Sequence, residues 1–186
     1  MKSFVLLLMT AFAAVYAQDR FTRELDDAAR VAAVMVDGDA CRRIVTPRAM
    51  EFMLRTDAAD RYLASDNYDV NHGAFDGIKK TLIRVSRLVS FPADANLWMP
   101  IPGHPDKIRV VIRNANELSQ FWPWGALFQE MVPEMATVLA TGRRITVARK
   151  PGWVSVLAPV SDSLGEIVAV VEVASQRLLD PHENVK

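Results

Sequence analysis

The N-terminal part of the chain has a helical pattern of apolar positions. Over residues 18–45, apolar side chains recur every three or four positions, as on one face of an α-helix. The stripe consists of Phe21, Leu25, Ala28, Ala32, Val36 and Ala40. Because most of these side chains are small, the stripe can pack closely against a neighbour. That neighbour is either the domain's own sheet or the same helix of a second subunit. Gly38 weakens the later part of this helix by roughly 1 kcal/mol relative to alanine.

Two further helices are predicted before the first strand. Thr46 and Pro47 mark a helix start, with Thr46 as the N-cap and Pro47 at the first helical position, and this helix reaches about Arg55. Residues 56–69 are polar and have no clear period. Another amphipathic helix is predicted over residues 74–89.

The second half of the chain has strand patterns. We predict strands at residues 97–101, 107–114, 144–149, 153–160 and 166–174, with an irregular aromatic stretch at 116–132 and a short helix at 133–141. Gly142 ends that helix, and Gly165 supplies a positive φ in the turn of the last hairpin. Helices followed mainly by strands predict an α+β fold. Its antiparallel sheet has about five strands, with the long N-terminal helix and further helices packed on it.

The first 17 residues are typical of a signal peptide. Lys2 precedes an apolar run over residues 4–15, about 12 residues against the roughly 20 that span a membrane. Small residues then stand at Val15 and Ala17, so we expect cleavage after Ala17 and a periplasmic or secreted protein. The alternative is that the segment stays uncleaved as an anchor.

Composition narrows the class of protein further. The chain has 22 basic and 22 acidic residues, and they are interspersed, which gives no electrostatic case for nucleic-acid binding. Its single cysteine, Cys41, cannot form an internal disulfide. With 51% hydrophobic residues, the chain can stabilise one domain by an ordinary core.

Three segments carry a resemblance to a known family. They are the "Ala-Pro-Val, Ser-Asp-x-x-Gly" hairpin over residues 158–173, the Ala-Thr-Gly-Arg-Arg segment at 140–144, and the long N-terminal helix with Val36-Asp37 near its end. In these segments and in the order of its elements, the chain resembles the Cache domains, extracytoplasmic relatives of the PAS fold, over roughly residues 30–175. We therefore expect a signal peptide at 1–17, an N-terminal helix at 18–45 and a polar tail at 181–186, and the resemblance implies a Cache/PAS-like domain at 46–180.

The resemblance implies a sensor module. In the family, a small molecule lies between the sheet and the excursion that joins the second and third strands, and its binding shifts the terminal helices. Family members are usually flanked by two membrane helices and followed by a cytoplasmic output module. Neither a second membrane span nor an output module is predicted here, so we expect a freestanding exported domain that acts through a partner such as a membrane sensor.

The predicted ligand-binding residues come from this excursion and the strands beside it. They are Trp98, Arg113, Trp122, Trp124, Phe128, Trp153 and Ser155. The aromatic side chains supply apolar area, and Arg113 can bind a carboxylate with its forked guanidinium. Each tryptophan can equally belong to the core or to a partner surface. Arg113 can equally form an ion pair with Glu117 or Asp162.

Other chemistries lack a matching pattern. His72, His104 and His182 are far apart, without cysteine or histidine at zinc-ligand spacing. Ser155 and Ser161 lack the Gly-x-Ser-x-Gly context of a hydrolase nucleophile. We therefore expect no metal site, no cofactor and no enzyme.

The leading hypothesis is an exported sensor-type domain that binds a small organic molecule, with carboxylates among the candidates. The alternative is an interaction or dimerisation module of the same fold without a ligand pocket. In that case the N-terminal helix mediates a homodimer, and Trp122 and Trp124 contact a partner.

Overall fold

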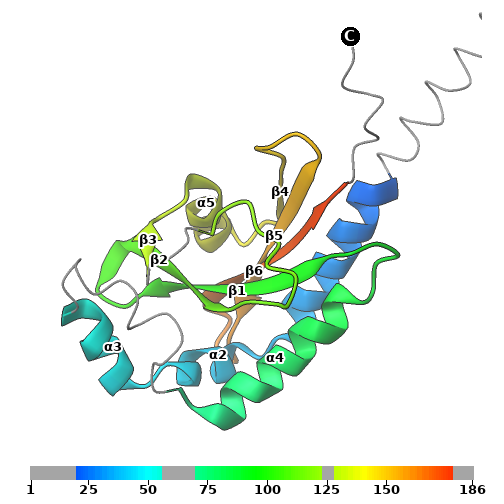
Figure 1. Ribbon diagram of the computed structural model, residues 1–186. Coiled ribbons are helices and arrows are strands. Elements are labelled where there is room, and N and C mark those ends of the chain that lie inside the picture. Colours follow the sequence, from blue (N-terminus) through cyan, green and yellow to red (C-terminus); the bar gives the residue numbers. More distant parts are fainter. Residues whose placement is uncertain (1–19, 56–69, 123–127, 178–186) are drawn as a thin grey trace, which may run out of the picture.

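The protein has an α+β fold with a curled antiparallel sheet (Figure 1). The computed structural model describes residues 20–55, 70–122 and 128–177. The helices are an N-terminal helix over residues 20–35, α2 (Gly38–Ile44), α3 (Pro47–Arg55), α4 (His72–Ser86) and α5 (Pro133–Thr141). The strands are β1 (Asp94–Ile101), β2 (His104–Ile112), β3 (Gln129–Glu130), β4 (Ile145–Val147), β5 (Trp153–Ser161) and β6 (Ile167–Gln176). Among the described residues, none of the helices is long and apolar enough to cross a membrane.

The sheet has six strands in the order β3-β2-β1-β6-β5-β4. The expected number of about five is therefore one too low. The additional strand is β3, whose two residues pair with Lys107 and Ile108 of β2. Two polar residues are too short a stretch to produce an alternating pattern in the sequence. The last strand, β6, lies at the centre of the sheet between β1 and β5, which explains why it is buried along almost its whole length.

One face of the sheet, which we call the helix face, is covered by the N-terminal helix, α2 and α4 (Figure 1). Ala28, Ala29 and Ala32 are buried there in one core cluster with strand residues such as Leu97 and Val156. The small side chains bring the helix close to the sheet. The alanine stripe thus packs on the domain's own sheet, which is one of the two partners that the sequence left open.

The predicted N-terminal helix over residues 18–45 is interrupted. It ends after residue 35, and α2 begins again at Gly38 with Asp37 as its N-cap, whose side chain accepts a hydrogen bond from the Ala40 amide. A β-carbon at Gly38 would lie 2.3 Å from the carbonyl oxygen of Ser161, the last residue of β5, and 2.6 Å from the Asp162 nitrogen in the turn that follows. Glycine at this position lets the hairpin turn approach the backbone of α2, and helix propensity gives no sign of this contact.

The opposite face, which we call the excursion face, is covered by α5 and by residues 113–122. Its core cluster includes Trp98, Ile108, Met135 and Leu157. The predicted helix over 133–141 is confirmed as α5, and Gly142 follows it in the left-handed conformation with a φ of 67°. The predicted cap at Thr46 is confirmed as well, because its hydroxyl accepts a hydrogen bond from the Ala49 amide at 3.1 Å.

Candidate functional site

A glutamate is fully buried on the excursion face. The Glu172 carboxylate, on β6, accepts hydrogen bonds from Trp98 Nε1 at 3.0 Å and from Ser119 Oγ at 2.7 Å on one oxygen. Its other oxygen accepts from the Gln120 amide at 3.2 Å and from Ser155 Oγ at 2.8 Å. Trp98 and Ser155, both predicted to bind a ligand, therefore meet around a side chain of the protein itself.

Burial and hydrogen bonding act in opposite directions on this carboxyl group. Burial raises the pKa of Glu172, because the charged form loses its hydration. The hydrogen bonds from Ser119, Ser155, Gln120 and Trp98 stabilise the charged form and offset part of that effect. The pKa of Glu172 stays above its ordinary value, so the group takes up a proton more readily in the folded protein than in the unfolded chain.

Gln120 extends the network across the sheet. Its side-chain nitrogen donates to Ser155 Oγ at 3.0 Å and to the carbonyl oxygen of Val147 at 2.9 Å. Its side-chain oxygen accepts from the backbone amide of Arg149 at 2.8 Å. These contacts tie the excursion to β4 and β5. The group of Trp98, Ser119, Gln120, Ser155 and Glu172 is called the Glu172 network below.

A second set of buried polar contacts fixes the beginning of the excursion. Asp94, on β1, is fully buried, and its carboxylate accepts from Asn116 Nδ2 and from the Leu118 amide, each at 2.9 Å. Asn96 accepts from the Asn114 amide at 3.1 Å and donates to the carbonyl oxygen of Leu118 at 2.8 Å. Because residues 114–120 are held at both ends, they lie closely on the sheet.

Arg113 and Trp122 form a contact of their own at the edge of the excursion. The guanidinium of Arg113 lies over the Trp122 ring, 3.9 Å from its centroid, which is a favourable cation–π geometry. A small space beside this pair is too narrow for a water molecule. Its lining includes Trp98, Arg113, Ser119 and Trp122. Asp162, one of the two ion-pair partners considered for Arg113, is instead bound by Arg42.

The remaining predicted site residues do not join this group. Trp153 is half-buried at the start of β5, with the Lys150 ammonium 5.6 Å from its ring centroid. Phe128 is half-buried immediately before β3. Trp124 lies outside the described residues. The described part of the excursion face therefore resembles a well-packed core more than a binding site.

A hollow of about 500 Å³ opens on the helix face, where α2 leads into α3. Its walls come from that junction, from the turn between β1 and β2, and from the beginning of β6. The lining residues are Cys41, Arg42, Val45, Thr46, Pro47, Met50, Met99, Pro100, Ile101, Pro102, Arg109, Ile167 and Val168. Small-molecule sites commonly have roughly 300–1,000 Å³, mostly apolar walls and a few polar groups. We call this space the α2–α3 hollow.

Cys41 and Arg109 are the chemically distinctive residues of the α2–α3 hollow. Burial raises the pKa of the Cys41 thiol to about 12, so this thiol stays neutral and behaves as an apolar group. Arg109 is only 2% exposed although it carries a charge, and its Nη1 lies 3.7 Å from the sulfur of Met50. A guanidinium buried to this extent needs compensating interactions within the protein.

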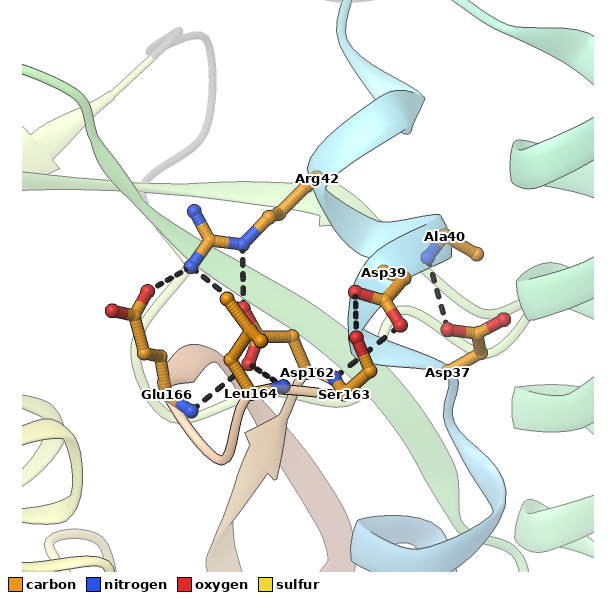
Figure 2. A network of polar contacts seen from close by, with 8 residues as sticks. All are labelled: Asp37, Asp39, Ala40, Arg42, Asp162, Ser163, Leu164 and Glu166. Atoms are coloured by element: carbon orange, nitrogen blue, oxygen red, sulfur yellow. Dashed lines mark hydrogen bonds and ion pairs between the residues drawn. The ribbon is translucent and has the colours of Figure 1, made fainter.

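One wall of the hollow is tied to the last hairpin (Figure 2). Arg42 lines the hollow and donates from Nε to Asp162 at 2.9 Å, and its Nη2 also bonds Glu166. Asp162 accepts from the Leu164 and Glu166 amides, which closes the turn, and Ser163 donates to Asp39 at 3.1 Å. These contacts couple α2 to the turn between β5 and β6.

Sequence reasoning missed Glu172 and Arg109. Each is a single charged residue within an otherwise apolar strand, in Val-Val-Glu-Val and Ile-Arg-Val-Val-Ile. That pattern is the sequence signal by which both could have been identified. A charged residue at such a position is buried and needs partners or a function. Within the described residues, no group of three or more His, Cys, Asp or Glu side chains could hold a metal ion. No protein-family model matches the sequence, and no curated protein matches it.

Proposed function

We propose that the protein is an exported sensor-type domain with a PAS-like, Cache-type fold that binds a small organic molecule and acts through a partner. The observation that carries this proposal is the α2–α3 hollow, with its volume of about 500 Å³ and its largely apolar walls. The α+β architecture and the curled antiparallel sheet are broadly compatible with a PAS-like fold. No catalytic role and no cofactor are part of the proposal.

The proposed binding site differs from the one that the family resemblance implies. That site lies between the sheet and the excursion, where the Glu172 network and the Arg113–Trp122 pair take up the space among the described residues. The α2–α3 hollow lies on the helix face instead, and its volume is in the range of small-molecule sites. We therefore place the ligand against α2 and α3.

The position of the hollow offers a route for a signal. Its walls include α2, which follows the N-terminal helix directly, and Arg42, which holds the turn between β5 and β6. A ligand that displaces α2 acts on both the N-terminal helix and the last hairpin. A partner in contact with either element then senses whether the site is occupied.

A thermal-shift screen of organic acids, amino acids and amines tests the proposed function. A ligand at a hundredfold excess over its Kd stabilises the native state by about 2.7 kcal/mol. The matched control is Met50→Trp, which fills the α2–α3 hollow. We expect at least one compound to raise the Tm of the wild type and to leave the variant unchanged. If no compound raises the Tm, or if it rises equally in the filled variant, the proposal fails.

The interaction-module alternative is supported by a different observation. Val34 and Met35 are 81% and 60% exposed at the end of the N-terminal helix, beside the break that precedes α2. Exposed apolar side chains that adjoin one another are typical of contact surfaces. Under this alternative the protein forms a dimer that Val34→Glu dissociates, with no ligand-induced change in Tm. Analytical ultracentrifugation of the two proteins distinguishes it from the leading proposal.

A further inference from the structure

The walls of the α2–α3 hollow are soft and apolar. The sulfur-containing side chains of Cys41, Met50 and Met99 lie among aliphatic residues such as Ile101 and Val168. Burial raises the pKa of the Cys41 thiol to about 12, so this group adds no charge to the wall. Methionine side chains are flexible and polarisable, so they adapt to ligands of varied shape. Most of the wall therefore suits a flexible hydrocarbon chain.

The two arginines that line the hollow are already engaged within the protein. Arg42 bonds Asp162 and Glu166. Arg109 is 2% exposed and has interactions of its own, one of them with the sulfur of Met50. None of the described residues that line the hollow is acidic. A charged group that entered the hollow would therefore lose its hydration without gaining a partner of opposite charge, which costs free energy.

Prolines reduce the number of backbone donors in the described lining. Proline has no backbone N–H, and three lining residues are Pro47, Pro100 and Pro102. Pro47 is the first residue of α3, and the next amides of that helix that lie near the hollow are occupied: Ala49 donates to the Thr46 hydroxyl and Met50 to the Thr46 carbonyl oxygen. The start of α3 thus offers little to hold an anion.

The mouth of the hollow lies at the surface of the protein. Arg42, Pro47 and Pro102 are exposed, whereas Cys41 and Ile101, which line the same space, are buried. A molecule whose apolar part lies against the buried residues can keep a polar end between the exposed ones, in contact with water. Such a position buries the hydrocarbon and leaves the charge hydrated.

We propose that the α2–α3 hollow binds the apolar chain of an amphiphile and leaves its head group in solvent at the mouth. This inference rests on the proposed function and names the class of ligand. The hollow then selects its ligand by the length of the apolar chain and not by the charge of the head group.

Isothermal titration calorimetry of the wild type with butanoate, hexanoate and octanoate tests the selection by length. These probes share a carboxylate and differ in the number of methylene groups. We expect the affinity to increase about fourfold with each methylene group that enters the hollow. This comparison uses the wild type alone and does not depend on how any variant folds.

A second series tests the role of the head group. Octanoate, octan-1-ol and octylammonium share a chain and carry a negative, a neutral and a positive head group. We expect their dissociation constants to agree within about fivefold, because a head group that stays hydrated pays no desolvation cost.

A variant places the chain in the hollow. Met50→Trp fills this space and is expected to weaken octanoate binding at least tenfold. The matched control is Leu88→Trp, which adds the same side chain at a residue that is 57% exposed and does not line the hollow. We expect this control to bind octanoate as the wild type does.

The possible failures are distinguishable from a failure of the proposed function. If the affinity does not increase with chain length, if one head group is preferred by more than about fivefold, or if Met50→Trp binds octanoate normally, the inference is wrong. The proposed function still stands if the thermal-shift screen gives a compound whose effect Met50→Trp abolishes. If no probe binds, the inference fails, and the proposed function fails with it when the screen also gives no ligand.

Discussion

The two faces of the sheet bury charge in different ways, and the difference indicates where a ligand fits. On the excursion face, the Glu172 carboxylate is surrounded by hydrogen-bond donors from β1, β5 and residues 119–120. On the helix face, the Arg109 guanidinium adjoins an apolar hollow of about 500 Å³. The two oxygens of this carboxylate are filled by donors of the protein and leave no group for a ligand, whereas a largely apolar hollow of this volume is suited to binding.

The two faces also reach close packing by different means. The helix face depends on small residues that let backbones approach, as at Ala29, Ala32 and Gly38. The excursion face depends on side-chain hydrogen bonds that fix an irregular segment. Steric substitutions should therefore damage the helix face most, and deletion of polar groups should damage the excursion face most.

The largest effect is expected at Gly38. In Gly38→Ala the new β-carbon would lie 2.3 Å from the Ser161 carbonyl oxygen, so α2 and the hairpin turn must separate. We expect a loss of about 3 kcal/mol in the free energy of unfolding, measured with urea. The matched control is Gly77→Ala in α4, where a β-carbon meets nothing within 4 Å. It should stabilise the protein by up to about 1 kcal/mol. Equal effects of the two substitutions would contradict the close contact.

The next largest loss of stability is expected when a buried hydrogen-bonding group is removed, in comparison with an exposed one. Ser155→Ala removes a donor to Glu172 and an acceptor for Gln120, both fully or almost fully buried. We expect a loss of about 1–3 kcal/mol in urea unfolding, because these groups are left unsatisfied in the core. Ser163→Ala removes an exposed hydrogen bond to Asp39 and should cost less than about 0.5 kcal/mol. Similar losses in both variants would show that the Glu172 network contributes no more than a surface contact.

A smaller effect is expected on the pH dependence of the unfolding free energy, through the titration of Glu172. The reference is Glu172→Gln, which removes the titrating carboxyl group. Because the folded pKa is raised, the wild type gains stability from this group below the unfolded pKa of about 4.3. That gain is lost as the pH rises through the folded pKa. The difference in unfolding free energy between wild type and variant should thus be largest near pH 4 and decrease toward neutral pH. A difference that grows with pH would mean that the hydrogen bonds outweigh burial and lower the pKa.

The smallest effect is expected at Arg42. Its ion pairs with Asp162 and Glu166 are partly exposed to solvent, so Arg42→Gln should lower the Tm only slightly. The effect should disappear in 1 M NaCl, because the Debye screening length is then only about 3 Å. Differential scanning calorimetry at low and high salt measures both. A large shift that salt does not change would show that Arg42 supports the fold through packing around the hollow.

Local features of the fold could be predicted from the sequence. The β-branched runs of β5 and β6, the Thr46 cap and the left-handed Gly142 follow from nearest-neighbour chemistry, and the structure confirms them. The break before α2 could not be predicted, because it depends on the contact between Gly38 and a turn more than a hundred residues away.

The candidate site could be predicted only in part. Trp98 and Ser155 were identified as residues that act together, and they do meet, but at Glu172 rather than around a ligand. That meeting depends on β6 lying between β1 and β5, which the strand pattern alone does not determine. Arg109 was missed although the apolar run around it was a signal of burial, because that run alone does not show which elements cover the side chain.

The central claim is that the ligand site lies on the helix face and not on the excursion face. The most direct test is a titration with a compound that raises the Tm in the thermal-shift screen, followed by methionine-methyl NMR. The methyl groups of Met50 and Met99 lie at the α2–α3 hollow, and that of Met135 lies in the core of the excursion face. We predict saturable shifts of Met50 and Met99 with Met135 unchanged. A shift of Met135 alone, or no shift in any of the three, would contradict the assignment.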